Sequence, residues 1–255
     1  MTPKLSLLMT AIRRERWAGV CDSIAASFSQ EWELIICGPH EPEKSLLDRG
    51  NVKYICDFGS PSRCQQRAFL AAEGEFVARM DDDGLWLPGA IDRAFALNPG
   101  RSQAVAVIFT EGENYNRAMV HEEHFHKRAH RLFQGLLFPD HWIVTSASVF
   151  ALRQDALAIG GFDCIFETSA ISTLDYGIRL QNYGVQIVML PGVSIHHTHM
   201  PGTSGDHGPM HHAQLAHDEP IFRSIYSQPN FIRRVSVDID NWRQSPDRWI
   251  RRFGA

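Results

Sequence analysis

Residues 78–86 read ARMDDDGLW, and in this stretch three consecutive carboxylates follow a short apolar run. Phe76 to Met80 has the length and composition of a buried strand, so the carboxylates mark its carboxyl end. Asp81, Asp82 and Asp83 repel one another unless a cation lies among them, and oxygen ligands suit Mg²⁺ or Mn²⁺ rather than Zn²⁺. We therefore expect a divalent cation here. The alternative is a solvated acidic turn that caps the next helix.

The three carboxylates need not do the same work. Side chains alternate along a strand, so Asp81 and Asp83 can face one way and Asp82 the other. Asp83 would then bind the metal, while Asp82 reaches a sugar hydroxyl of a bound nucleotide. A divalent cation at this position would neutralise a diphosphate leaving group.

Apolar runs and helical patterns alternate on both sides of this stretch. We expect strands over residues 4–10, 32–37, 52–56, 76–80 and 104–110, and helices over residues 17–28, 62–73 and 88–97. Strands that alternate with helices predict an α/β protein with a parallel, doubly wound sheet. In such sheets, ligands bind beyond the carboxyl ends of the strands, which is where the carboxylates lie.

The second half of the chain is less regular. Residues 114–131 are polar and predict a hairpin or loop, and residues from 196 onward form a long extension. Between them we expect a strand over 143–152, a helix over 153–159, a turn over 160–163, a helix over 174–183 and a strand over 185–190. We expect one catalytic domain over residues 1–200, with a nucleotide-binding half (about 1–110) and an acceptor half (about 111–200). Residues 201–255 would form a C-terminal loop and tail.

Composition excludes several classes of protein. The chain has 255 residues and a formal net charge of −4, so it lacks the basic field that binds nucleic acid. Its five cysteines include no CxxC pair, which indicates reduced thiols. We find no signal peptide and no run of eighteen apolar residues, so we expect a cytoplasmic protein. Attachment to the inner face of the membrane stays open.

Four segments in order carry a resemblance to a known family: KLSLLMTAIRRERW, WELIICG, AFLAAEGEFVARMDDDGLWLPGAID and SASVFALRQDALAIGGFD. Together they resemble the family 2 glycosyltransferases of the GT-A fold over roughly residues 4–199. The resemblance implies an αβα sandwich with a mostly parallel central sheet. It also implies metal-dependent transfer of a sugar from a nucleotide-sugar donor to a hydroxyl acceptor, in polysaccharide or glycoconjugate synthesis.

The resemblance assigns roles to individual residues. The carboxylates Asp81 to Asp83 would bind the donor and its Mn²⁺ or Mg²⁺ ion, with Asp83 as metal ligand and Asp82 as ribose contact. Thr10 and Ala11 lie where the family contacts the nucleotide, mostly through backbone groups.

Two departures from the family pattern bear on the donor. Where the family usually has an acidic pair that reads the nucleobase, this chain has CGPH at residues 37–40, including Gly38. We therefore expect a less acidic base pocket and a donor outside the uridine diphosphates. Gln65 and Gln66 replace an Arg-Asn pair, and we expect the nearby Arg63 to contact a phosphate or to be a solvated helix residue.

An inverting transfer needs a carboxylate that takes the proton of the acceptor hydroxyl. In the family this base lies in an ED-x-D segment, and Ser172 and Thr173 stand at its acidic pair here. Asp175 is the remaining aspartate and our candidate base, with Glu167 as the second candidate. The alternatives are that Asp175 only caps or solvates the start of a helix, or that the mechanism is retaining.

Seven of the thirteen histidines lie between residues 196 and 217. In many GT-A enzymes a histidine after the last core strand completes the metal site, which makes His197 and His199 candidates, and His196 a third. Zinc binding and a hydrated loop without a function are alternatives. The Gly- and Pro-rich residues 201–209 predict a mobile loop that folds over the donor.

From residue 221 onward the chain has seven arginines against three aspartates, with interleaved aromatic residues. This composition suits contact with anionic lipids, where a lipid-linked acceptor would be presented. We favour the alternative, in which the tail packs on the domain and its arginines are solvated or lie at a homodimer interface. Two other functions stay open: a nucleotidyltransferase that acts on sugar phosphates, and a non-catalytic relative that binds nucleotide-sugars.

Overall fold

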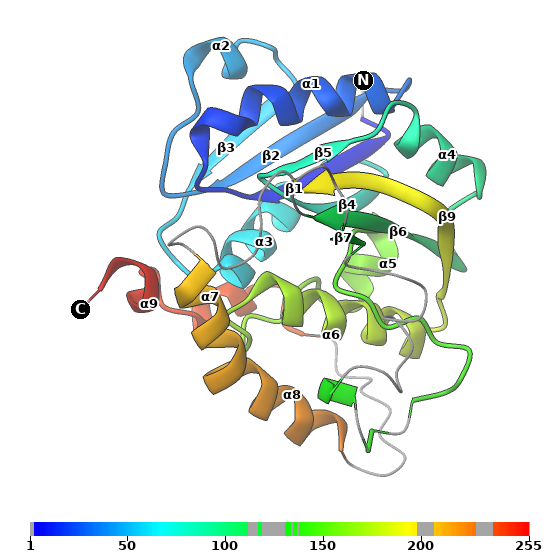
Figure 1. The fold of residues 1–255 in the computed structure, drawn as a ribbon, viewed down its shortest axis with the longest axis vertical. Helices are drawn as coiled ribbons and strands as arrows, with labels where there is room; N and C mark the ends of the chain where they lie inside the picture. Colours follow the sequence, from blue (N-terminus) through cyan, green and yellow to red (C-terminus); the bar gives the residue numbers. More distant parts are fainter. Residues whose placement is uncertain are drawn as a thin grey trace.

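The computed structural model describes residues 3–111, 117–118, 131–133, 135–136, 138–197, 207–227 and 237–254. Its centre is a nine-stranded sheet in the order β3-β2-β1-β4-β8-β6-β9-β5, with β7 paired to β6 (Figure 1). The strands are β1 (Leu5–Thr10), β2 (Trp32–Gly38), β3 (Val52–Cys56), β4 (Phe76–Asp81), β5 (Gly84–Trp86), β6 (Gln103–Glu111), β7 (Arg117–Ala118), β8 (Val149–Leu152) and β9 (Gln186–His197).

Helices connect these strands. The α-helices are α1 (Trp17–Ser27), α2 (Lys44–Leu47), α3 (Pro61–Leu70), α4 (Ala90–Ala96), α5 (Arg153–Ala158), α6 (Ser169–Asn182), α7 (His207–Ala213), α8 (Glu219–Tyr226) and α9 (Ile250–Phe253). Short 3₁₀ helices are η1 (Arg14–Arg16), η3 (Arg131–Phe133) and η5 (Asn241–Gln244), and the π-helical turn η4 (Gln214–Asp218) joins α7 to α8. In the part of the chain that these ranges cover, no helix is long and apolar enough to cross a membrane.

The N-terminal half of the sheet is parallel, as the sequence predicts. Strand β1 pairs in parallel with β2 and β4, and β2 pairs in parallel with β3. The register aligns Thr10 with Cys37 on one side and with Asp81 on the other. This register brings the carboxyl ends of three strands to one edge of the sheet.

The remaining strands correct the sequence-based boundaries. The expected strand over 143–152 is only the short β8, which pairs antiparallel with both β4 and β6. Strand β9 continues to residue 197 because its end pairs with β5, where Gly84 is opposite His197. His196 and His197 therefore lie in a strand and not in an extension. Of the polar stretch 114–131, only residues 117–118 and 131 are among those described.

The core has a layer on each face of the sheet. Helices α1 and α4 pack on one face, with Trp17, Ile24 and Ile91 in the cluster that β1 also enters. Helices α3 and α6 pack on the other face, through residues such as Phe69 and Leu180. A third apolar cluster joins α6 to α8 and η3 and includes the buried residues Phe166, Ile178, Phe222 and Tyr226. Helix α8, which we expected in the C-terminal tail, is thus packed against the second half of the expected catalytic domain. All five cysteines are free.

Candidate functional site

The carboxylates lie where β4 ends and the chain turns into β5. Asp81 is the last residue of β4 and its side chain is 27% exposed, whereas the side chains of Asp82 and Asp83 are each 3% exposed. The solvated acidic turn that we considered as the alternative is therefore wrong. Two carboxylates this deeply buried need compensating charge or hydrogen bonds.

Two arginines that the sequence analysis did not single out supply this charge. Arg79 donates to Asp81 and, at 2.7 Å, to the carbonyl oxygen of Ser146. Arg13 donates to Asp82, and its Nη1 lies 3.6 Å from Oδ2 of Asp83. The sequence did contain a reason to look for these arginines. Adjacent carboxylates need a nearby positive charge, and an arginine supplies it as well as a metal ion does.

Asp82 also holds the loop that follows β1. Its Oδ2 accepts hydrogen bonds from the backbone N–H groups of Ile12, at 2.6 Å, and Arg13, at 2.7 Å. Both backbone groups come directly after Thr10 and Ala11. Asp82 thus orders the loop at the predicted nucleotide contact, and its own contact with ribose stays a prediction.

The environment separates the pKa values of two of these carboxyl groups. Burial acts to raise the pKa of Asp81, but the positive charge of Arg79, with His197 and Arg13, outweighs it and lowers the pKa to about 2. Burial, with the neighbouring Asp81 and Asp82, raises the pKa of Asp83 to about 6, although the positive charges of His197 and Arg13 act to lower it. Asp83 is therefore the carboxylate that a further cation would stabilise most.

His197 joins the carboxylates from the end of β9. Its Nε2 lies 3.6 Å from Oδ2 of Asp81, and its ring stacks on Phe109 with 4.6 Å between ring centroids. Glycine at position 84 makes room for the imidazole, because a Cβ there would lie 3.1 Å from Nε2 of His197. His196 is engaged elsewhere, with its Nδ1 2.6 Å from Oγ1 of Thr110, and His199 lies outside the described residues.

Asp81, Asp83 and His197 offer the carboxylate and imidazole ligands that Mn²⁺ or Mg²⁺ accepts, with imidazole suiting Mn²⁺ better. Within the described ranges, no three His, Cys, Asp or Glu side chains are arranged to hold a metal ion by themselves. An open set of this kind fits a cation that shares its coordination with phosphate oxygens, as Mg²⁺ commonly does. The described histidines of the His-rich segment likewise do not form a zinc site.

The predicted backbone contacts lie beside the carboxylates. The N–H of Ala11 donates to the carbonyl oxygen of Cys37 at 3.0 Å, and Thr10 is aligned with Asp81. Gly38 approaches so closely that a Cβ would lie 2.0 Å from the carbonyl oxygen of Ala11. Only glycine fits at this position, which joins the ends of β1 and β2.

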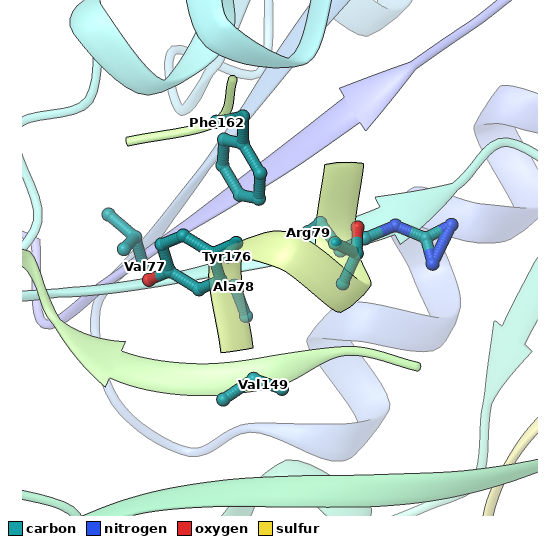
Figure 2. Close-up of a pocket in the computed structure, with 7 residues that line it drawn as sticks. Val77, Ala78, Arg79, Val149, Phe162 and Tyr176 are labelled. Carbon is teal, nitrogen blue, oxygen red and sulfur yellow. The ribbon is translucent and has the colours of Figure 1, made fainter. Parts of the chain in front are cut away.

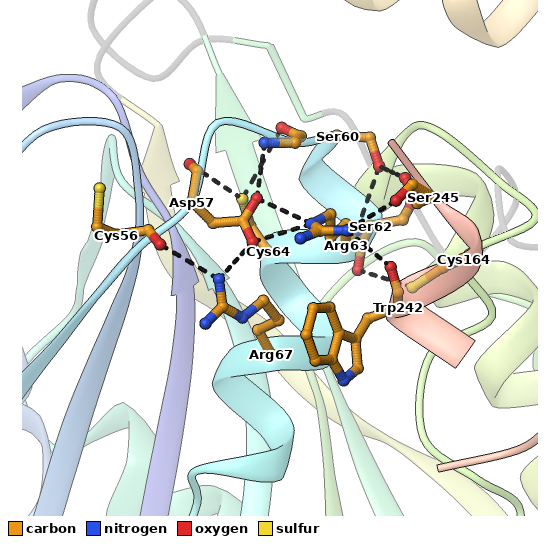
Figure 3. A network of polar contacts seen from close by, with 11 residues as sticks. Cys56, Asp57, Ser60, Ser62, Arg63, Cys64, Arg67, Cys164, Trp242 and Ser245 are labelled. Carbon is orange, nitrogen blue, oxygen red and sulfur yellow. Dashed lines mark hydrogen bonds and ion pairs between the residues drawn. The ribbon is translucent and has the colours of Figure 1, made fainter. Parts of the chain in front are cut away.

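Arg63 lies elsewhere, in the network of polar contacts that Figure 3 shows. It is 7% exposed, pairs with the buried Asp57 at 2.9 Å, and donates to the carbonyl oxygens of Trp242 and Ser245 at 3.0 and 2.7 Å. The expectation of a solvated helix residue is wrong, because Arg63 anchors the C-terminal segment. Its contact with a phosphate stays a prediction, and these partners would have to be released for it.

Asp175 is buried in the second turn of α6. It is 0% exposed, and accepts hydrogen bonds from Nε of Arg179 at 2.7 Å and from the hydroxyl of Tyr226 at 2.6 Å. Because α6 begins at Ser169, Asp175 neither caps nor solvates a helix start, so that alternative is wrong. An acceptor hydroxyl would have to displace one of these partners to reach Asp175, whose role as the base stays a prediction.

Glu167 lies just before α6 and is more accessible, with 23% of its side chain exposed. Its Oε2 accepts hydrogen bonds from Nε of Arg251 and, at 3.2 Å, from Nε1 of Trp249. Its Oε1 lies 3.9 Å from Nε2 of His217. Sequence reasoning gave none of these three partners a place beside Glu167, because they lie 50 to 84 residues away along the chain.

A small apolar pocket lies between β4, β8 and α6 (Figure 2). Its lining residues are Val77, Ala78, Arg79, Val149, Phe162, Thr173 and Tyr176. The ring of Tyr176 stacks on Phe162 at 4.5 Å, and burial raises the pKa of its hydroxyl. Thr173, which the resemblance places at the family's acidic pair, lines this pocket and is 1% exposed.

Two positions at which the sequence departs from the family pattern are in contact between α3 and α6. Nε2 of Gln65 donates to Oγ1 of Thr173 at 3.3 Å, and the hydroxyl of Ser172 donates to Oε1 of Gln65 at 3.4 Å. The resemblance places Gln65 at the arginine of the family's Arg-Asn pair, and Ser172 and Thr173 at its acidic pair. Neutral hydrogen bonds thus occupy positions where the family pattern has opposite charges.

Comparisons with known proteins find similarity in the structure but not in the sequence. No protein-family model matches the sequence, and no curated protein matches it. Three solved structures of S. aureus TarS, residues 1–349, are similar at 15% sequence identity. The structure of TarS alone has a TM-score of 0.56 and covers 76% of this chain, and the complexes with UDP and with UDP-GlcNAc have TM-scores of 0.57 and cover 78%.

This chain spans about three fifths of the length of those TarS chains, at 60%, 61% and 59%. The similarity covers three quarters or more of this chain. Taken with the strand order, it shows that the chain has the GT-A type of glycosyltransferase fold.

Proposed function

We propose that this protein is a glycosyltransferase that moves a sugar from a nucleotide-sugar donor to a hydroxyl acceptor with the help of Mn²⁺ or Mg²⁺. The observation that carries this proposal is the approach of His197 to Asp81, 3.6 Å apart, beside the buried Asp83 at the carboxyl end of the parallel strand β4. In open α/β sheets this edge is the usual place for a bound ligand. The similar TarS structures in complex with UDP and with UDP-GlcNAc support a nucleotide-sugar as the donor.

Asp83 and His197 would hold the cation, with Asp81 beside them. When bound, the cation supplies Lewis-acid neutralisation of the diphosphate that leaves with the nucleotide. The protein's own part is to hold the donor in place. Backbone groups of Thr10 and Ala11 would contact the nucleoside, in a loop that Asp82 keeps ordered.

Gly38 would let the nucleoside approach the ends of β1 and β2 without a side chain in the way. The uncharged CGPH sequence at residues 37–40 favours a nucleobase other than uracil. The TarS complex with UDP-GlcNAc favours uracil instead, so a panel of donors has to decide. The acceptor would be a saccharide or lipid-linked hydroxyl of a polysaccharide or glycoconjugate.

An inverting transfer would use Glu167 as the base. Its side chain is partly exposed, and Oε1 makes no hydrogen bond shorter than 3.5 Å with the described residues. Asp175 is the second choice, because Arg179 and Tyr226 engage both of its oxygens. A group that takes a proton must come within hydrogen-bond reach of it, which favours Glu167.

The test is a panel of UDP-, GDP-, ADP-, CDP- and dTDP-sugars, each with Mn²⁺ or Mg²⁺, in which donor hydrolysis is measured. Asp83→Ala is expected to abolish metal-dependent binding of the nucleoside diphosphate, since it removes the principal ligand, while the melting temperature stays within a few degrees. Calorimetry with the nucleoside diphosphate and Mn²⁺ measures this, and Asp48→Ala, at an exposed position on the same domain, is the control. Unchanged affinity in Asp83→Ala would contradict the metal assignment.

A non-catalytic relative that binds nucleotide-sugars is the second candidate. The contact between Gln65 and Thr173 favours it, because charged residues of the family pattern are missing at both positions. Such a protein would bind a nucleoside diphosphate with Mn²⁺ yet hydrolyse no donor of the panel.

A further inference from the structure

The side chain of Glu167 is held by the C-terminal segment, residues 241–253. Nε of Arg251 and Nε1 of Trp249 both donate to Oε2 of Glu167. Trp249 is 4% exposed, so its indole N–H is aimed at the carboxylate from a packed position. One carboxylate oxygen is thus fixed by two donors, which leaves Oε1 as the oxygen without a hydrogen bond to the described residues.

The backbone of Glu167 is held separately, by the turn between α7 and α8. Asp218 is 0% exposed and accepts hydrogen bonds from the N–H groups of Glu167 and Thr168, both at 2.8 Å. Asp218 also lies 2.8 Å from Nδ1 of His217, whose other ring nitrogen faces Oε1 of Glu167 at 3.9 Å. Glu167 therefore has a fixed backbone and one fixed carboxylate oxygen.

The C-terminal segment is itself anchored, so it can act as a rigid support. The N–H of Trp249 donates to the carbonyl oxygen of Phe58 at 2.8 Å, in the loop between β3 and α3. The buried pair of Asp57 and Arg63 holds the preceding turn through Trp242, as Figure 3 shows. Long-range contacts from α3 thereby fix the segment that fixes Glu167.

We infer that Arg251 and Trp249 are positioning residues for the catalytic base, and that they aim Oε1 of Glu167 at the acceptor. This inference rests on the proposed function. In the transfer, the acceptor oxygen forms a bond to the anomeric carbon while its O–H bond breaks and its proton passes to Oε1. The bond from the anomeric carbon to the diphosphate oxygen breaks, and the nucleoside diphosphate leaves with the electron pair. In donor hydrolysis, water takes the place of the acceptor.

The experiment measures hydrolysis of the nucleotide-sugar that the donor panel selects and, separately, calorimetric affinity for the matching nucleoside diphosphate with Mn²⁺. Arg251→Met is expected to lower kcat by about 10- to 100-fold, the scale for a misplaced catalytic group, with the affinity unchanged within about twofold. Arg251→Lys keeps the charge but not the planar guanidinium, so it should recover part of the loss. Arg243→Met, a matched loss of charge at a side chain that is 67% exposed in the same segment, should have no effect on kcat.

A second background separates positioning from a general structural role. In Glu167→Gln the base is absent, so adding Arg251→Met should cause little further loss, because residues that act as a unit are not additive. Equal losses from Arg251→Met in both backgrounds, an unchanged kcat, or a matching loss of nucleoside diphosphate affinity would each overturn the inference. If the unaltered protein binds no nucleoside diphosphate, the proposed function is wrong and the inference falls with it; if it binds without hydrolysing any donor, the catalytic role of Glu167 is overturned while donor binding stands.

Discussion

Glu33 on β2 shows how this molecule stabilises a buried carboxylate at a distance from the site. It is 4% exposed and accepts hydrogen bonds from the hydroxyl of Ser6 and, at 2.7 Å, from the backbone N–H of Glu73. Lys53 lies 2.8 Å away. Burial acts to raise the pKa of Glu33, but these partners outweigh it and lower the pKa.

Because the folded-state pKa of Glu33 lies below the unfolded value, its contribution to stability is present above the unfolded pKa and is lost as the pH falls through the folded one. Glu33→Gln should lower the free energy of unfolding by about 1.5–3 kcal/mol at neutral pH, the range for hydrogen bonds to a charged group. The gap should narrow below about pH 4. Urea unfolding at several pH values measures it, with the exposed Glu75→Gln as control; a gap that widens in acid would contradict the assignment.

The carboxylate cluster was predictable at the level of single residues, and its partners were not. Three adjacent acids at a strand end identify Asp81 to Asp83 because the pattern is local. Arg13 and Arg79 compensate the negative charge of these carboxylates, and the register between β1 and β4 brings them close. This register cannot be read from a single sequence. The repulsion argument required a cation but did not tell an arginine from a metal.

At the scale of elements, the predicted ends of helices and strands were wrong where they depend on contacts with residues far away in the sequence. Helix α6 begins at Ser169 and not at residue 174, because Asp218 binds the backbone N–H groups that precede it. Strand β5 has three residues, too few for an alternating pattern to identify. The longer parallel strands were predicted well, since continuous apolar runs are typical of strands covered on both faces.

Helices α3 and α6 meet at Gln65 and Thr173, which are 0% and 1% exposed. Each single change, Gln65→Arg or Thr173→Asp, should destabilise the protein by about 3–5 kcal/mol, because it buries a charge without a partner. The double variant should recover at least about 1 kcal/mol through an ion pair between the helices. A double-mutant cycle of urea unfolding measures the coupling, and strictly additive losses would mean that the two positions do not pair when charged.

For the whole molecule, composition alone did not tell whether the C-terminal tail meets lipid or protein. In the described part, residues 237–254, the aromatic residues face the domain: Trp242 lies under Arg63 and Arg67 at 4.8 and 5.0 Å, and Phe253 packs on Phe58. Tertiary contacts with residues near position 60 determine that these aromatic residues face the domain. Such contacts cannot be predicted from the local sequence of the tail. The observed packing agrees with the alternative that we favoured, and contact with a membrane stays a prediction.

A chain that ends at Asp240 tests whether the tail stabilises the domain or contacts a membrane. It removes both carbonyl partners of Arg63, the buried Trp249 and the donors to Glu167, so it should lose about 3–5 kcal/mol of unfolding free energy, the scale of a large core truncation. Loss of Arg251 should also lower donor hydrolysis. Thermal melts and sedimentation with anionic phospholipid vesicles measure the outcome, and a chain that ends at Gly254 is the control. If the tail serves as a lipid contact alone, truncation would leave the melt unchanged and abolish vesicle binding, which would contradict a tail that supports the acceptor half.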